Sequence, residues 1–412
     1  MDERPDVVVI GGGPAGLAAA LGAKRAGAGD VLLIEREKRL GGILNQCIHD
    51  GFGLFLYNET ISGPEYAERL IEDVVKEGVR TETGAMVLDL DADRVLRVNA
   101  RSGYGLIKAR SVVLAMGCRE RTREMIEIPG TRPAGIFTAG AAQNLVNLQN
   151  IRVGNEAVIL GSGDIGLIMA RRLTFEGTAV KGVFEIMPWT NGLERNVRQC
   201  LMDFGIPLEL SSTIVEVRGR DRVESVIVAK VDDGLRPVAG SEREVRCDTL
   251  LLSVGLIPEN ELSKRAGVEL SPLTGGAVVD ETFMTSAAGI FSCGNVLQIH
   301  DVADFASQEG FAAGAFAARF ARGELAAGPQ LRLEPGPDVR YVLPQRVRPG
   351  TADLEVSFRT VRPLRGCRVV ARGRSSGKVY LSKRCGRLLP SELQRLRIER
   401  AVEEDLEVAC HE

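Results

Sequence analysis

Two stretches of the chain share one pattern of apolar and polar positions. In the first, the apolar, β-branched run Val7 to Ile10 predicts a short buried strand, and an alanine- and leucine-rich stretch after a glycine cluster predicts a helix. A second apolar run, VLLIE, predicts another strand that ends at Glu35. Strand, glycine turn, helix and strand in this order predict a βαβ unit.

The glycine cluster of this unit has the spacing G-x-G-x-x-G and consists of Gly11, Gly13 and Gly16. The first glycine allows a tight turn, the second lets a pyrophosphate approach the backbone, and the third lets helix and strand pack closely. The helix N-terminus then offers N–H groups and a partial positive charge to the phosphates. Because Glu35 is placed to accept hydrogen bonds from a ribose diol, the unit predicts dinucleotide binding.

The same pattern returns at Val158 to Leu160, which predict a strand, and at GSGDIG, which predicts the turn. The next strand, VKGVFE, ends at Glu185, whose charge repels a ribose 2′-phosphate, and the following IMPW contains no arginine to bind one. NADH is therefore favoured over NADPH. The alternative is a degenerate domain that binds no nucleotide. The residues expected to contact NAD are Gly161, Gly163, Asp164, Ile165, Gly166, Glu185 and Gly255.

Composition narrows the class of protein. The 412 residues are enough for two or three domains, and 44% hydrophobic residues support a core. A net charge of −3 argues against a general polyanion binder such as a nucleic-acid protein. No apolar run reaches the length of a membrane span, and the N-terminus MDERPD is acidic where a signal peptide is basic. We therefore expect a cytoplasmic protein without direct membrane insertion.

Several further segments resemble the flavoproteins with two dinucleotide-binding domains, the pyridine nucleotide–disulfide oxidoreductase superfamily. They are GGGPAG, the E-x5-GG stretch from Glu35 to Gly42, VVLAMG, GSGDIG, LLLSVGLIPEN and GIFSCGNV. The resemblance implies an α/β fold with two Rossmann-like domains that bind FAD and NAD. It also implies a split FAD domain of residues 1–118 and 278–327, with an NAD domain of residues 119–277 inserted between the two parts.

The last of these segments resembles the superfamily's second FAD motif, except that Gly294 is followed by Asn295 where the motif has Asp. Asparagine keeps an acceptor oxygen but has no charge. The stretch from Ala303 predicts the closing helix, whose N-terminus the resemblance points at the flavin, with Asp301 as its N-cap. The residues expected to contact FAD are Gly11, Gly13, Pro14, Ala15, Gly16, Glu35, Arg36, Gly42, Gln46, Val87, Gly117, Gly294, Asn295 and Asp301.

A narrower resemblance rests on GGILNQCIHDGFG, GPEYAERL, AMGCRERTR and CGNVLQIHDVADF. These segments look like the FAD/NAD oxidoreductases associated with FAD-dependent glycerol-3-phosphate dehydrogenases. They are also similar to the alpha subunits of opine, proline, hydroxyproline and cyanide-forming amine dehydrogenases. The resemblance implies a companion FAD-dependent dehydrogenase subunit, with a hetero- or homo-oligomeric assembly left open.

The eight cysteines contain no C-x-x-C pair, and most are expected to be reduced, buried thiols. Where disulfide reductases of the superfamily carry two cysteines after the glycine pair, this chain has Leu44 and His49. A two-cysteine relay is therefore not expected. Cys47 between them is interpreted as a residue packed beside the flavin, and the alternative is a single cysteine that cycles to sulfenate.

The chain has three histidines, of which His49 and His300 lie in segments expected near the flavin. They are the candidate catalytic residues, together with Cys47, because a histidine there can form hydrogen bonds with the flavin or manage its proton. The alternative is that both histidines only support their loops. A metal site is not expected, since hydride transfer needs none.

The crossover segment CRERTR, Cys118 to Arg123, alternates arginines with polar residues. Arg119, Arg121 and Arg123 are candidates for a phosphate or domain-interface clamp. An ordinary solvated, charged connection is the equal alternative.

Residues 328–412 form a separate basic tail, in which residues 340–400 carry sixteen Lys and Arg against four Asp and Glu, a net charge of +12. LEVSFRTV, RGCRVVARG and KVYLSKRCGRLL predict strands, and residues 389–406 predict a final helix. The small, β-rich tail is interpreted either as a basic docking face for an acidic partner or as an ordinary solvated surface. Few aromatic residues and no known module argue against nucleic-acid binding.

Together these patterns predict an FAD-dependent oxidoreductase that transfers a hydride between NAD(H) and flavin, as the electron-transfer subunit of a dehydrogenase of the glycerol-3-phosphate or amine type. The alternatives are a stand-alone NADH oxidase or peroxidase that uses one cysteine, and a non-catalytic flavoprotein redox sensor.

Overall fold

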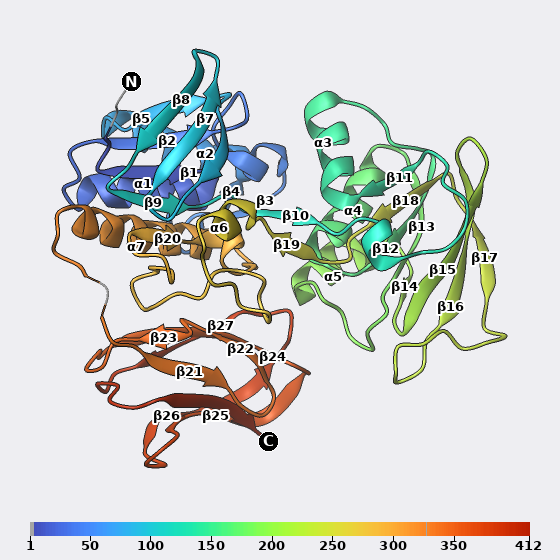
Figure 1. Cartoon of the computed structure of the whole chain (residues 1–412). Helices are drawn as coiled ribbons and strands as arrows, with labels where there is room; N and C mark the ends of the chain where they lie inside the picture. Colours follow the sequence, from blue (N-terminus) through green and yellow to red (C-terminus); the bar gives the residue numbers. More distant parts are fainter. Residues whose placement is uncertain (1–3, 327) are drawn as a thin grey trace. The chain divides into compact units, whose positions relative to one another are not determined.

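The computed structural model describes residues 4–326 and 328–412. The chain divides into two compact units (Figure 1), the first made of the residues up to Cys118 and from Pro258 onward, and the second of Arg119–Ile257. The N-terminal residues 1–3 of the acidic MDERPD segment and the expected domain end at residue 327 lie outside the described residues. Among the described residues, no helix combines the length and the apolar composition of a membrane span.

The first unit is built on a parallel five-stranded sheet with the order β20-β9-β1-β2-β5. The apolar runs predicted at residues 7–10 and 31–35 form β1 and β2, and both are buried throughout. The bounds of the strands are β1 Val7–Ile10, β2 Val31–Glu35, β5 Arg80–Thr83, β9 Ser111–Leu114 and β20 Ile290–Ser292.

Helices α1 (Pro14–Arg25) and α7 (Ala303–Ala321) pack closely on this sheet. Glycines allow the approach: a Cβ on Gly310 would lie 2.2 Å from Ala15 O, and one on Gly314 would lie 1.9 Å from Ala19 O. The expected closing helix is therefore confirmed. The expected N-cap is wrong, because Val302 occupies the cap position and no side chain caps the helix.

The rest of this part of the first unit consists of short elements around the sheet. An antiparallel three-stranded sheet, β6-β7-β8, covers buried residues such as Leu90 and Leu96. The bounds are η1 Gly42–Gln46, β3 Asp50–Phe52, β4 Ile61–Ser62, α2 Gly63–Lys76, β6 Met86–Leu90, β7 Val95–Ala100, β8 Gly103–Lys108, α6 Glu261–Arg265 and η4 Gly294–Val296, with β10 Cys118–Glu120 and β19 Leu256–Pro258 in the two connections to the second unit.

The second unit repeats the design with a parallel sheet of order β11-β18-β12-β13-β14 and a separate antiparallel sheet, β15-β16-β17. It ends at Ile257, earlier than the expected boundary at 277, because Ala266, Val268 and Ala277 pack into the core of the first unit. Its elements are η2 Glu124–Ile126, β11 Ile136–Thr138, α3 Ala139–Gln149, β12 Glu156–Leu160, α4 Asp164–Phe175, β13 Ala179–Phe184, α5 Glu194–Cys200, η3 Met202–Phe204, β14 Leu208–Glu209, β15 Ser212–Gly219, β16 Val223–Lys230, β17 Arg243–Arg246 and β18 Thr249–Leu252.

The tail is a β-domain of two sheets, β23-β21-β28-β25-β26 and β22-β24-β27, around a core that includes Phe358, Val369 and Ile398. The final helix predicted at residues 389–406 is wrong: β27 occupies part of this segment, and β24 pairs with it so that Leu354 faces Ile398. The bounds are β21 Leu331–Pro335, β22 Val339–Leu343, β23 Arg346–Val347, β24 Leu354–Thr360, β25 Leu364–Gly373, β26 Val379–Leu388, β27 Gln394–Ile398 and β28 Leu406–His411.

Candidate functional site

The first glycine turn joins β1 to α1 with backbone contacts that exclude any side chain. A Cβ on Gly11, which has a φ of 107°, would lie 2.4 Å from Ala115 O, and one on Gly16 would lie 1.7 Å from Gly11 O. These two glycines therefore allow strands β1 and β9 and helix α1 to meet, as the spacing predicted.

The second glycine of this turn faces open space. A Cβ on Gly13 would meet no atom within 4 Å, and Pro14 begins α1 without an N–H. Leu17 N–H donates to Gly13 O at 2.9 Å, so the N–H groups of Ala15 and Gly16 precede the first bond inside the helix. Open space beside a bare helix N-terminus fits the pyrophosphate of a dinucleotide.

Glu35 at the end of β2 is buried, and backbone groups hold its carboxylate. Its Oε2 accepts from Gly12 N–H at 2.6 Å and its Oε1 accepts from Glu37 N–H at 2.7 Å. Each oxygen keeps a second lone pair, so the fixed carboxylate fits the predicted bonds to a ribose. Arg36 beside it is largely exposed, with Nε 3.8 Å from Glu37 Oε1.

The remaining glycines predicted for this site lie around the same turn. A Cβ on Gly42 would lie 3.0 Å from Gly13 Cα, and a Cβ on Gly117, which has a φ of 74°, would meet open space. A Cβ on Gly294 would lie 2.5 Å from Ala15 Cβ, so the second motif closes on the start of α1. Val87, the second residue of β6, is buried in the core.

Asn295 uses its side-chain oxygen to hold the following loop. Its Oδ1 accepts from His300 N–H at 3.0 Å and lies 3.2 Å from His300 Nδ1, while its Nδ2 is 3.6 Å from Cys118 Sγ. The asparagine that replaces the motif's aspartate therefore organises the loop that carries His300.

The ring of His300 lies inside the protein, next to a buried glutamate of α7. Its side chain is 2% exposed, and its Nε2 is 3.0 Å from Glu309 Oε1 without the angles of a hydrogen bond. Glu309 Oε2 accepts from Gly294 N–H at 3.0 Å. A carboxylate thus lies between the second glycine motif and the histidine.

His49 has different surroundings, on the segment after η1. Its side chain is half-buried, its ring lies 5.2 Å from that of Phe52, and its Nδ1 is 2.9 Å from Asp50 O. The prediction that His49 and His300 serve one flavin stays a prediction.

Cys47 is buried at the end of the same 3-10 helix. Its Sγ donates to Ile43 O at 3.3 Å, and burial raises the pKa of the thiol to about 12. Gln46 beside it is 5% exposed. A thiol that stays protonated at neutral pH is a poor nucleophile, which fits the packing interpretation of Cys47.

Two features of this region were not predicted from the sequence. Asp304 in the first turn of α7 is fully buried and accepts backbone N–H groups from Gly53, Phe55 and Leu56 at 3.0–3.2 Å. In the sequence, an acidic residue in the first turn of the predicted helix was the signal that could have pointed to this role of Asp304. The second feature is a group of exposed apolar side chains on the neighbouring segment, which consists of Ile43, Ile48, Leu54 and Phe55.

The glycine turn of the second unit has the same backbone arrangement as the first turn, but more side chains contact it. A Cβ on Gly161 would lie 2.1 Å from Ser253 O, one on Gly163 would lie 3.1 Å from Ser253 Oγ, and Gly166 N–H donates to that hydroxyl at 3.2 Å. Ile165 is half-buried in the first turn of α4. Gly255 has a φ of 107°, and its Cβ would lie 3.7 Å from Arg121 Cδ.

Glu185 and Asp164 hold the polar groups around this second turn. Glu185 Oε2 accepts from Ser162 N–H at 2.9 Å and from its hydroxyl at 2.6 Å, while Oε1 accepts from Met187 N–H at 2.9 Å. Asp164 Oδ1 accepts from Leu193 N–H at 2.8 Å and from Asn196 Nδ2 at 2.6 Å. Asp164 therefore ties the 191–196 segment to the start of α4.

Of the crossover arginines, Arg123 is a structural residue. It is 4% exposed, and its guanidinium donates to the carbonyl oxygens of Ile128, Pro129 and Thr131 at 2.5–3.1 Å. The phosphate-clamp interpretation is therefore wrong for Arg123, because backbone carbonyls already occupy its donors. Arg121 N–H donates to Gly255 O at 3.0 Å.

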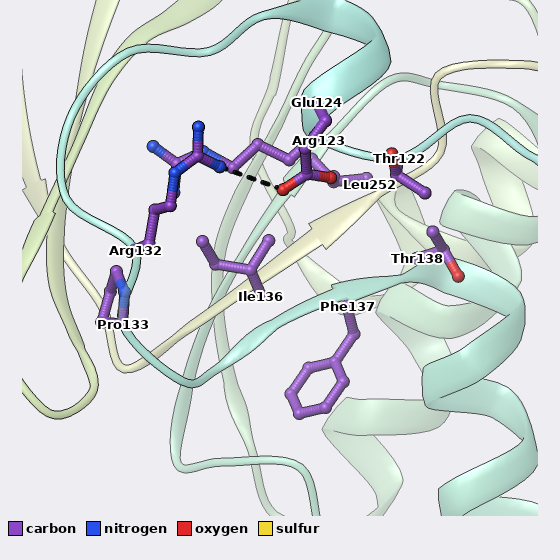
Figure 2. A pocket seen from close by; sticks show the side chains of 9 residues that line it. All are labelled: Thr122, Arg123, Glu124, Arg132, Pro133, Ile136, Phe137, Thr138 and Leu252. Carbon is purple, nitrogen blue, oxygen red and sulfur yellow. Dashed lines mark hydrogen bonds and ion pairs between the residues drawn. The ribbon is translucent and has the colours of Figure 1, made fainter.

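A pocket of about 380 Å³ lies beside this segment in the second unit. Figure 2 shows the Arg132 and Glu124 side chains meeting at its rim, with Arg132 Nη1 3.2 Å from Glu124 Oε1. None of the residues predicted to contact FAD or NAD lines it. The lining residues are Thr122, Arg123, Glu124, Arg132, Pro133, Ile136, Phe137, Thr138 and Leu252.

Neither a metal site nor a disulfide is present among the residues that the structure describes. No group of three or more His, Cys, Asp or Glu side chains is arranged to hold a metal ion, and all eight cysteines are outside disulfides.

Comparison with known proteins identifies a family and several relatives. A family described as pyridine nucleotide-disulphide oxidoreductase matches residues 5–310. The hydrogen cyanide synthase subunit HcnB of Pseudomonas aeruginosa is 25% identical over 342 residues, which cover 78% of this chain and 70% of that protein. An opine oxidase subunit of Agrobacterium tumefaciens is 27% identical over 313 residues, covering 70% of this chain and 61% of that protein.

Solved structures support the fold. Thioredoxin reductase of T. acidophilum is 22% identical and superposes with a TM-score of 0.64, covering 77% of this chain and 98% of that one. The NAD-dependent persulfide reductase of A. fulgidus is 20% identical with a TM-score of 0.58, covering 90% and 69%.

Proposed function

Because the chain belongs to the pyridine nucleotide-disulphide oxidoreductase family, whose members bind FAD and NAD(P), we propose that it transfers a hydride between NADH and FAD on behalf of a companion dehydrogenase. That the chain is a flavin-dependent pyridine nucleotide oxidoreductase follows from the family match. The choice of NADH, the companion and the role within a larger enzyme are the proposed parts.

The main support for the proposal is an arrangement that occurs in both units: a glycine turn, a helix N-terminus and a buried glutamate. In the first unit, Gly13 faces open space beside the start of α1, and two backbone N–H groups fix the carboxylate of Glu35, which supports binding of a ribose there. When bound there, FAD supplies a ring that accepts and returns a hydride. The protein's part is to bind the pyrophosphate, orient the ring and place the loop of His300 next to it.

The preference for NADH rests on Glu185. Its carboxylate is fixed by Ser162 and Met187 at the end of β13, where the ribose of a nucleotide on the second turn would lie. A second negative charge on that ribose would meet this carboxylate. NADPH is therefore disfavoured.

The role within a larger enzyme rests on the relatives. HcnB and the opine oxidase polypeptide are, by their names, subunits of larger enzymes. We propose a companion of the FAD-dependent dehydrogenase type for this chain also. Its substrate class is that of glycerol 3-phosphate or of an amine or amino acid.

The thiol-based alternatives receive less support. Cys47 is a buried thiol with its pKa raised to about 12, which disfavours both an oxidase or peroxidase that cycles through sulfenate and a dithiol relay. His49, His300 and Cys47 remain the proposed residues near the flavin. The two histidines are the candidates for proton management.

Anaerobic stopped-flow mixing with NADH and, separately, with NADPH tests the proposal. We expect flavin absorbance near 450 nm to bleach rapidly with NADH and at least about tenfold more slowly with equal NADPH, a difference of about 1.4 kcal/mol. Absence of bleaching with either nucleotide would reject hydride transfer and favour a redox sensor. The role within a larger enzyme is tested by the rate at which the reduced flavin is reoxidised. A rate that is higher with a purified candidate companion than in buffer alone would support this role.

A further inference from the structure

The β-domain formed by residues 328–412 contacts the loop that follows the second glycine motif. Two polar side chains of its strand β24, Ser357 and Arg359, reach residues 298–301 of this loop. Both side chains and the loop belong to the first compact unit, which contains the β-domain and the parallel sheet.

Arg359 binds the loop at two points. Its Nη2 donates to Ile299 O at 2.9 Å and forms an ion pair with Asp301, while its Nη1 donates to Pro390 O at 3.1 Å. The side chains of Arg359 and Asp301 are 11% and 13% exposed, so little solvent competes for the pair. Removing one partner of such a pair leaves the other charge buried and uncompensated.

Ser357 starts a second connection, which ends at the glycine motif itself. Gln298 Nε2 donates to Ser357 Oγ at 3.1 Å and to Glu309 Oε1 at 2.5 Å, and Glu309 Oε2 accepts from Gly294 N–H at 3.0 Å. Gln298 is 1% exposed and Glu309 is 8% exposed. A continuous line of buried hydrogen bonds therefore runs from the β-domain to Gly294.

A third contact holds the start of α7 from the same side. Arg395 of β27 donates to Gln308 Oε1 at 2.7 Å, and its guanidinium lies 4.7 Å from the centre of the Phe305 ring. The β-domain therefore fixes both the loop and the first turns of the helix that follows it.

Other contacts of the β-domain lie away from this loop and distinguish two roles. Arg348 pairs with Glu281 at 2.6 Å, and Gln345 Oε1 accepts from Val279 N–H at 3.0 Å. These bonds attach the β-domain to the chain before β20, with no bond to residues 294–301. If the β-domain were only attached to the rest of the unit, loss of a contact from either set would affect FAD binding equally. If Ser357 and Arg359 position the loop, loss of their contacts should weaken FAD binding more than loss of the others.

We propose that Ser357 and Arg359 are positioning residues that hold the segment from Gly294 to Asp301 in its flavin-binding conformation. The β-domain is thus part of the FAD site, acting through the loop rather than by touching the cofactor. This inference rests on the part of the proposed function that assigns FAD to the first unit. It does not depend on which nucleotide or companion the protein uses.

The test compares Arg359→Ala with Arg348→Ala, since each variant removes one arginine that ties the β-domain to the rest of the first unit. We measure FAD bound per chain from the absorbance ratio, the dissociation constant by titrating apoprotein with FAD, the flavin midpoint potential, and thermal unfolding by circular dichroism. We expect a dissociation constant at least about tenfold higher for Arg359→Ala and within about twofold of the parent for Arg348→Ala. The melting temperature of Arg359→Ala should also fall, because Asp301 is left buried without its partner.

Two milder variants keep the test decisive if Arg359→Ala does not fold. Ser357→Ala is expected to weaken FAD about threefold, and Arg359→Lys, which keeps the charge but loses the forked donors, to lie between parent and alanine variant. Equal FAD affinity for all variants and the parent would overturn the inference. So would a loss of FAD in Arg348→Ala that equals the loss in Arg359→Ala.

The outcomes also separate this inference from the proposed function. A parent protein that binds no FAD would reject the flavin assignment and the inference together. A parent that binds FAD which NADH does not reduce would reject only the hydride-transfer part, and the affinity comparison would still decide the role of Ser357 and Arg359.

Discussion

In the first glycine turn the residue after the second glycine is Pro14, whereas in the second turn it is Asp164. Pro14 leaves the N-terminus of α1 without a polar side chain, and a Cβ on Gly13 would meet open space. Asp164 instead binds Leu193 N–H and Asn196, and Ser162 Oγ accepts from Asn191 N–H at 2.9 Å. The protein's own chain thus occupies part of the second turn.

We infer from this difference that the same glycine spacing can support two kinds of nucleotide binding. The first turn has no side chain over its helix N-terminus, which would suit a cofactor that stays bound. The second turn is held by side chains of Ser162, Asp164 and Ser253 that a nucleotide must share, which suits a substrate that comes and goes. Variants in the two turns test this contrast, and variants of Cys47 test the packing interpretation of that thiol.

The largest effect is expected for Gly16→Ala. Its Cβ would lie 1.7 Å from Gly11 O, a backbone atom that cannot swing away as the end of a flexible side chain can, so we expect a loss of about 3 kcal/mol of unfolding free energy and of most bound FAD. Gly166→Ala is the matched variant, because its Cβ would first meet the Ser253 side chain at 2.7 Å. Equal losses in denaturant unfolding would contradict the view that a clash with backbone costs more here than a clash with the Ser253 side chain.

The next effect concerns the two buried glutamates. Glu185→Gln removes the charge that opposes a 2′-phosphate, and we expect the NADPH to NADH ratio of kcat/KM to rise about tenfold, as the loss of about 1.4 kcal/mol of repulsion implies. Glu35→Gln is the control, and we expect it to weaken FAD binding and to leave the NADPH to NADH ratio of kcat/KM unchanged. If Glu35→Gln shifts the ratio as much as Glu185→Gln does, the assignment of the two turns fails.

A smaller effect is expected for Asp164→Asn, which keeps the shape of the side chain but removes a negative charge from the N-terminus of α4. Phosphates of NADH then meet a more positive helix end, so we expect NADH to bind about three times more tightly at low salt, with FAD content unchanged. Isothermal titration at two ionic strengths measures this. Weaker binding would mean that Asp164 acts mainly by holding the 191–196 segment.

The smallest effect is expected at Cys47. Cys47→Ser should leave the rate of flavin reduction by NADH within about twofold of the parent, because hydride transfer uses no thiol. Burial raises the pKa of Cys47 to about 12 from the ordinary thiol range, so its stabilising effect is complete below the unfolded pKa and is lost as pH rises toward 12. Melting temperatures of Cys47→Ala should accordingly fall less than those of the parent between about pH 8 and pH 10.5.

The sequence was most informative where local spacing determines geometry. Gly11, Gly16, Gly161 and Gly166 make the contacts that their spacing predicted, because a strand, a turn and a helix that follow one another pack locally. The resemblance also pointed to the loop of His300. It did not reveal Glu309 as the neighbour of that ring, since nothing in the local motif encodes the contact.

Errors arose where distant partners decide the structure. LQRLRIER has charges and leucines that suit a helix, but pairing with β24 makes Gln394–Ile398 a strand, with Leu396 and Ile398 buried and Arg397 exposed. Asp301 precedes a helix as an N-cap does, yet its carboxylate binds Arg359, far along the chain. Sequence spacing alone contains neither partner.

The central sheet of the first unit has a consequence for the order in which the protein is made. Strand β20 pairs with β9 through Ile290–Val112 and Ser292–Leu114, so this sheet stays open at one edge until the ribosome has passed residue 292. The second unit, Arg119–Ile257, is continuous and completes its own sheets earlier in synthesis. A nascent chain can therefore complete the second unit while the parallel sheet of the first unit still lacks strand β20.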